Sequence, residues 1–168
     1  MSAVIQRQFR FTFNLERHRC FATVCHGISS VDVEASNICE PLRDLANALI
    51  LLHRSPGWQR TAVWLVEPGQ SCPEATSLPV PGQFRWLLDR YGDDVRIRIL
   101  WSPDNSNRDD GEMIFDSTAP LKRVATQISG QMKQLLNDGG LAGYHERWGR
   151  PFPHDQLSDL IDVIEKAG

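Results

Sequence analysis

Residues 84–101 read FRWLLDRYGDDVRIRILW, and this stretch decides what kind of fold the chain can form. Large hydrophobic residues alternate with other residues, mainly arginines, on both sides of the polar segment Tyr91-Gly92-Asp93-Asp94. Alternation with a period of two is typical of half-buried strands, and a short polar connection between two such runs indicates a β-hairpin. So short a connection excludes a parallel crossover. We therefore expect antiparallel strands at 83–90 and 95–101.

The segments before this hairpin also show strand patterns. Residues 8–14 alternate phenylalanines with polar residues, which predicts a half-buried strand, and 20–26 is expected to be its hairpin partner. A third short strand is expected at 31–33. Residues 61–67 are apolar on both faces, which favours a strand that is covered on both sides. A further short strand is expected at 113–115.

A helix is expected between the third of these strands and the fourth. Asn37 and Glu40 have the spacing of a capping box, and Pro41 suits a first helical turn because its missing N–H costs little there. An apolar stripe with helical spacing then continues to Ser55-Pro56-Gly57, which ends the helix.

The C-terminal part of the chain is expected to be helical. Ser117 or Thr118 is expected to cap a helix that has Pro120 in its first turn and ends at 137–140. One or two more turns are expected at 141–148. A final amphipathic helix is expected after the Pro-Phe-Pro segment.

The expected element order is β-β-(β)-α-β-β-β-β-α-α. The economical fold for this order is α+β, with one largely antiparallel sheet of about five to seven strands and helices packed on one face. A length of 168 residues is usual for one domain and allows a real hydrophobic core. We expect 1–168 to form a single α+β domain with a helical C-terminal part at 118–168.

Composition and charge exclude several classes of protein. The chain is 41% hydrophobic and 23% charged, which excludes a disordered chain, and its net charge of -3 argues against nucleic acid. Its longest apolar stretch, Ala48–Leu52, is far too short to cross a membrane. The N-terminus lacks the apolar core of a secretory signal, so the four cysteines are expected to be free thiols in a reducing cytoplasm. We expect a cytoplasmic protein without membrane or nucleic-acid partners.

No motif in the chain indicates catalysis or a cofactor. The P-loop, G-x-G-x-x-G and G-x-S-x-G patterns are absent. A group of histidines and cysteines at 18–26 lies on a predicted strand, whose rise separates Cys20 from His26 by about 20 Å. Zinc ligands lie only about 2.0–2.3 Å from one ion, so we expect no metal site. The reactivity of two thiols stays open: Cys39 lies in a first helical turn, and Cys72 in a loop.

Arginines stand opposite the large hydrophobic residues on the predicted strands. Arginine is favoured at protein interfaces and forks onto carboxylates. If the strands are neighbours, these arginines line one sheet face that docks an acidic partner or a second subunit; alternatively, they are ordinary outward residues paired with local acids. Glu67, at the end of a hydrophobic strand, is expected either to anchor the turn or to orient the partner. The arginines are Arg10, Arg85, Arg96 and Arg98.

The chain resembles a group of small uncharacterised bacterial α+β proteins. The resemblance rests on the segments Asn37–Leu42, Glu67-Pro68-Gly69, Phe84-x-Trp86 and 95–99, and on a tail that runs from Gly143 to Pro153. Such single domains are similar in style to immunity proteins of bacterial toxin systems. The resemblance therefore implies binding rather than catalysis, and it implies no catalytic residues.

Three hypotheses follow. We expect a non-catalytic protein-binding domain that acts through the arginines and Glu67, and the resemblance implies that it is of the immunity type. The alternative is a small enzyme or ligand-binding protein with a pocket between the sheet and the C-terminal helices. The third hypothesis is a homodimer whose function is structural. The residues expected to line such a pocket are Trp64, Trp86, Trp101 or Trp148.

Overall fold

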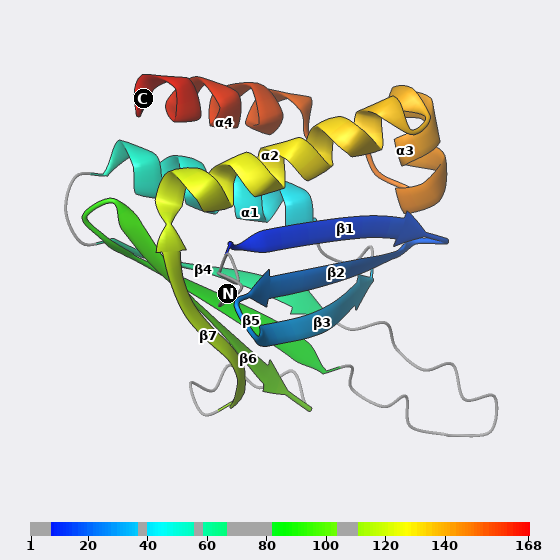
Figure 1. Ribbon diagram of the computed structural model, residues 1–168. Coiled ribbons are helices and arrows are strands. Elements are labelled where there is room, and N and C mark those ends of the chain that lie inside the picture. Colours follow the sequence, from blue (N-terminus) through cyan, green and yellow to red (C-terminus); the bar gives the residue numbers. More distant parts are fainter. Residues whose placement is uncertain (1–7, 37–39, 56–58, 67–81, 104–110) are drawn as a thin grey trace, which may run out of the picture.

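The computed structural model describes residues 8–36, 40–55, 59–66, 82–103 and 111–168, and for 59–66 only the backbone. Within these residues the element order is β-β-β-α-β-β-β-β-α-α-α. The α+β class expected from the sequence is confirmed. Figure 1 shows the helices on one side of the strands, with α1, α2 and α4 lying across them.

The first three strands form a meander. They are β1 (Arg10–Glu16), β2 (Arg19–His26) and β3 (Ser29–Ser36), paired antiparallel in the order β1-β2-β3. The predicted hairpin is confirmed, and β3 is longer than the expected segment 31–33. In β1 the phenylalanines point into the core while the polar residues between them are exposed, as the alternation predicts.

The next four strands form a second antiparallel sheet. They are β4 (Gln59–Val66), β5 (Gln83–Tyr91), β6 (Asp94–Ser102) and β7 (Glu112–Pro120), in the order β4-β5-β6-β7. The β5–β6 hairpin confirms the prediction from residues 84–101. The expectation of one sheet of five to seven strands is wrong, because the strands divide into sheets of three and four.

One physical reason why no strand of the second sheet pairs with β1 is found at that edge of the first sheet. The backbone N–H of Phe13 donates to Gln131 Oε1 at 3.0 Å, and that of Phe11 to Gln127 Oε1 at 3.4 Å. The two glutamines are four residues apart on one helix, so they share a face and follow the strand. The edge of β1 therefore pairs with helix side chains in place of another strand.

The four helices are α1 (Pro41–Arg54), α2 (Leu121–Asn137), α3 (Gly140–Trp148) and α4 (His154–Lys166). Helix α1 confirms the predicted helix with Pro41 in its first turn, but the predicted capping box is wrong: Glu40 is itself the N-cap residue, and the helix begins only at Pro41. Asn37 lies outside the described residues. The predicted start of α2 is wrong, because Ser117 and Thr118 belong to β7. Pairing with β6 continues to Pro120, so the ladder keeps these residues extended before the helix begins.

One hydrophobic core joins the two sheets and the helices. It contains residues from β1 through α4. The ring of Phe11 in the first sheet meets Trp86 in the second at a centroid distance of 6.2 Å, edge to face. Helix α1 packs on β4 and α4, and α2 packs on β1. This core covers the inner face of the second sheet. The opposite face of that sheet is therefore the candidate for a functional surface.

Candidate functional site

The face of the second sheet that points away from the core combines charged and apolar side chains. We call this surface the outer face. Its described residues alternate with the core residues along three strands. They include Arg85, Leu87, Asp89 and Tyr91 on β5, Arg96, Arg98 and Leu100 on β6, and Met113, Asp116 and Thr118 on β7; of these, Leu87 and Asp89 are buried.

A two-point ion pair crosses from β6 to β7 on the outer face. Arg96 donates from Nε to Asp116 Oδ1 at 2.8 Å and from Nη2 to Oδ2 at 2.6 Å. This geometry matches the fork of a guanidinium to the two oxygens of a carboxylate. The hydrogen bond from Arg96 lowers the pKa of Asp116, and it raises the pKa of Arg96. Both groups therefore stay charged near neutral pH.

A second ion pair crosses from β6 to β5. Arg98 Nη2 donates to Asp89 Oδ2 at 2.6 Å. The Asp89 side chain is fully buried, whereas Arg98 keeps 21% of its side chain exposed. Together with Arg96 and Asp116, these residues form a patch of alternating charges across three strands, which we call the Arg/Asp network. A buried carboxylate is costly unless it is paired, so the network holds Arg98 firmly in place.

The structure brings together three of the four predicted arginines. Arg85, Arg96 and Arg98 share the outer face, and Arg85 is half-buried there. Arg10 lies in the first sheet, exposed and opposite Cys25 of β2. The alternation of apolar and polar residues in the sequence predicts the side of the strand that each arginine occupies. It does not predict which sheet that strand belongs to. Arg96 and Arg98 are paired with local acids.

Glu67 lies outside the described residues, as do Cys39 and Cys72. The two cysteines that the structure does describe form no disulfide: Cys20 is buried in the core and Cys25 is half-buried. No group of three metal-binding side chains occurs among the described residues.

Three of the tryptophans have described side chains, and none of the three lines either of the two cavities described below. Trp86 and Trp148 are buried in the core, and Trp101 packs against it while half-buried. Trp64 belongs to β4, in the part of the chain where side chains are not described. The two cavities treated below are lined by other residues.

Two exposed apolar side chains on the outer face were missed by sequence reasoning. Tyr91 is 50% exposed at the end of β5, where the sequence indicated only a turn. Met113 is 53% exposed on β7. Register shifts at Ile99/Leu100 leave Ile114 without a pairing partner, so Met113 stands opposite Leu100 on the outer face. Such a bulge re-aims a side chain, and no sequence signal announced it.

A separate cavity of about 320 Å³ lies between the C-terminal ends of α1 and α4. His53 lines it with Arg54, Asp162 and Lys166. Its Nδ1 lies 2.8 Å from the carbonyl oxygen of Leu49, and because a carbonyl can only accept, this nitrogen carries the proton. Burial lowers the pKa of His53; the hydrogen bond to Leu49 acts against this, and the charge of Arg90 acts with it. The imidazole is therefore neutral at pH 7.

We expect the protein to lose stability as the pH falls below the ordinary histidine pKa of about 6.5. Because the pKa of His53 is lowered in the folded state, the unfolded state binds more protons in this range, and acid favours unfolding. Urea unfolding at a series of pH values checks this. His53→Gln should show a shallower loss than wild type, whereas His154→Gln, at an exposed position on α4, should follow wild type. Parallel curves for all three proteins would contradict the prediction.

No helix within the described residues is long and apolar enough to cross a membrane. Comparison with known proteins found no matching family model, no matching curated protein and no matching solved structure. The outer face must therefore be interpreted from its own chemistry.

Proposed function

We propose that this protein is a non-catalytic protein-binding domain and that the outer face of its second sheet is the binding surface. The observation that carries the proposal is the Arg/Asp network, which lies between the exposed side chains of Tyr91 and Met113. Tyrosine, methionine and arginine are enriched in protein interfaces, and tyrosine and arginine dominate binding energy there. Arginines already held by ion pairs lose little side-chain freedom when a partner binds.

The network also bears on the chemistry of the partner. The charges of Arg96 and Asp116 cancel, as do those of Arg98 and Asp89. Such a surface attracts a partner only weakly from a distance, so steering by net charge is a minor effect. It selects instead for apolar side chains that cover Tyr91 and Met113 and for polar groups that bond to the arginines.

The resemblance to small bacterial proteins extends this proposal. An immunity-type protein acts by covering the working surface of a toxin and needs no catalytic group of its own. A sheet face with exposed apolar residues at its margins suits such a role. We place this activity in the cytoplasm of a bacterium, with a different protein as partner in preference to a second copy of the chain.

Paired charge substitutions on the outer face test the proposal. Tyr91→Glu with Met113→Glu puts two carboxylates where apolar contact is expected, so partner binding should weaken at least about tenfold. Leu51→Glu with Leu141→Glu is the matched control, because both leucines are exposed on helices away from the outer face. Proteins captured from a cell lysate by wild type are purified and titrated against all three forms.

A partner that binds wild type and control but not the outer-face variant supports the proposal. Equal binding to all three forms, or no partner at all, contradicts it. Light scattering is measured on the same samples. A dimer that the outer-face variant breaks would identify the partner as a second copy and overturn the assignment of a different protein.

A further inference from the structure

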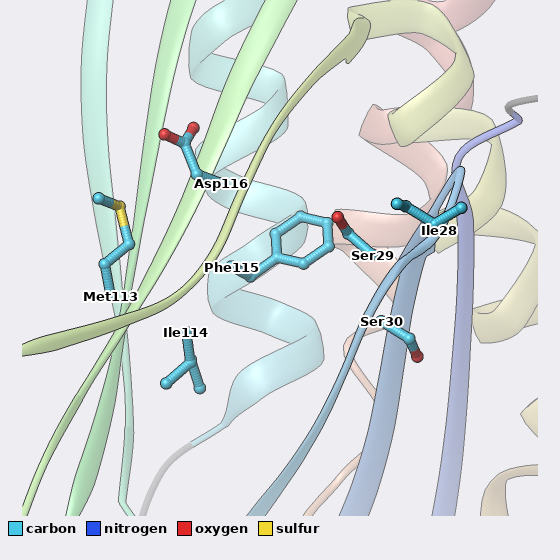
Figure 2. A pocket seen from close by; sticks show the side chains of 7 residues that line it. All are labelled: Ile28, Ser29, Ser30, Met113, Ile114, Phe115 and Asp116. Atoms are coloured by element: carbon cyan, nitrogen blue, oxygen red, sulfur yellow. The ribbon is translucent and has the colours of Figure 1, made fainter.

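Two cavities in the described part of the chain differ in what they offer a ligand. The larger is a groove of about 470 Å³ between the start of β3, with the turn before it, and a stretch of β7. Figure 2 shows Phe115 directed toward Ser29, and Met113 and Asp116 on the opposite side of β7. Asp116 is the ionisable residue of this lining, and Arg96 already holds its carboxylate. The groove therefore has no charge left with which to recognise a ligand.

The smaller cavity, of about 320 Å³, lies where α1 and α4 end, and its lining has mixed chemistry. Pockets for small molecules have volumes of roughly 300–1,000 Å³, so this cavity is at the lower end of that range and suits a ligand of a few heavy atoms. Helix α1 contributes His53 and Arg54. The end of α4 contributes Asp162, Val163, Lys166 and Ala167.

His53, which lines this cavity, has an unused hydrogen-bond acceptor. Its Nδ1–H donates to the carbonyl oxygen of Leu49 at 2.8 Å, so Nε2 carries the lone pair of the neutral ring. Nε2 is buried and has no hydrogen-bond partner among the residues that the structure describes. A buried acceptor without a donor costs free energy, and most such groups in proteins are paired. An N–H group of a ligand would supply the missing donor.

Charged side chains of both signs line the same cavity. Asp162 and Lys166 are four residues apart on α4, so they share one face of the helix. Both are exposed, and neither forms an ion pair or hydrogen bond with another described side chain. Arg54 adds a second cation, whose pair with Asp159 spans 3.8 Å between side chains that are more than half exposed. One carboxylate and two cations are therefore available to a ligand.

This arrangement favours a ligand that itself carries both charges. A simple anion would meet Asp162 and the C-terminal ends of two helices, which carry partial negative charge. A simple cation would be repelled by Arg54 and Lys166. A zwitterion avoids both conflicts, because its ammonium group can donate to Asp162 and to His53 Nε2 while its carboxylate accepts from the two cations.

The remaining lining residues are apolar and small. Val163 and Ala167 are also four residues apart, so they form a second strip of the cavity wall against which a short hydrocarbon group can pack. We infer that the cavity between α1 and α4 binds a free α-amino acid with a small apolar side chain, its ammonium group toward Asp162 and its carboxylate toward Lys166. The site lies among the helices, away from the outer face, so it adds a second binding activity to the proposed function.

Calorimetric titration and thermal unfolding with L-alanine, L-valine and L-leucine test the inference. We expect L-valine to bind and to raise the midpoint of thermal unfolding, because a ligand that binds only the folded state stabilises it. Two analogues of valine each lack one charge: 2-hydroxyisovalerate has no ammonium group, and isobutylamine has no carboxylate. Each should bind at least about tenfold more weakly than L-valine, because one charged group of the cavity then has no counterpart.

Substitutions on α4 locate the site. Asp162→Asn removes the charge that the ammonium group meets, so it should weaken binding of L-valine about tenfold. Asp155→Asn makes the same change near the start of α4 and should leave binding unchanged. Lys166→Gln should weaken binding through the carboxylate, whereas Lys133→Gln on α2 is its matched control. All four positions are exposed, so folding is preserved.

The results separate this inference from the proposed function. Absence of binding by all three amino acids, equal binding of either analogue, or unchanged binding to Asp162→Asn would each overturn the amino-acid site. Partner capture reports on the outer face, so Asp162→Asn should capture the partner as wild type does. Loss of capture by the outer-face variant with L-valine binding intact would show that the two sites are independent, as inferred.

Discussion

Replacing Asp89 with alanine is expected to lower the free energy of unfolding by about 3 kcal/mol. The Asp89 carboxylate is fully buried and accepts a hydrogen bond from Arg98 at 2.6 Å. Removing it leaves the Arg98 guanidinium, itself largely buried, without this counter-charge. Breaking a buried pair from one side is costly because the remaining charge has lost both its water and its partner. Urea denaturation monitored by circular dichroism measures the change.

Asp116→Ala is the matched control. It breaks the neighbouring pair with Arg96, but both of these side chains are substantially exposed, so the loss of stability should be much smaller than for Asp89→Ala. Replacing Asp89 and Arg98 together by Leu and Met should recover much of the loss, because no unpaired charge is then buried. Equal losses for Asp89→Ala and Asp116→Ala would show that burial does not govern the network.

Replacing Arg90 with methionine is expected to lower the free energy of unfolding by about 2–4 kcal/mol. Arg90 is the last residue of β5 on the core side before the turn, and its guanidinium reaches the C-terminal end of α1. Nη1 donates to the carbonyl oxygens of Leu52, of His53 at 3.3 Å and of Ser55 at 2.9 Å, and Nε donates to Gly92 at 2.7 Å.

The last carbonyls of a helix have no partner within the helix, and a cation there also interacts favourably with the helix dipole. Methionine keeps much of the apolar stem of Arg90 but removes every donor. Arg54→Met is the control on the same helix, because Arg54 only makes an exposed 3.8 Å pair with Asp159, and its loss should cost less than about 0.5 kcal/mol. Thermal and urea unfolding of the two variants should differ clearly; similar values would refute a capping role for Arg90.

Several elements could be predicted from local pattern alone. The β5–β6 hairpin follows from residues 84–101, since alternation and a polar turn are properties of neighbouring residues. Helix α1 follows from its apolar stripe and from Pro41. The start of α2 could not be predicted, because Ser117 and Thr118 have capping chemistry but are held in β7 by pairing with β6. A distant strand decided between two conformations that the local sequence allows.

The candidate site was predictable only in part. Alternation placed Arg85, Arg96 and Arg98 on the polar side of their strands, and they do share the outer face. Asp89 and Asp116 were not singled out, because a carboxylate on a strand does not reveal which arginine lies diagonally across the sheet. A β-bulge at Ile114 shifts the pairing register of β7 by one residue. Met113 therefore lies on the outer face, opposite Leu100.

The sequence by itself determined the α+β class, the antiparallel hairpins and the face that each side chain of a regular strand occupies. These depend on period and turn chemistry, which act between residues close together in the chain. Only the tertiary structure decided that the strands divide into two sheets, that Arg10 is separated from the other arginines, and that a groove opens beside β7. Those outcomes depend on which edges meet across long stretches of chain, as where Gln127 and Gln131 of α2 take the place of a strand beside β1.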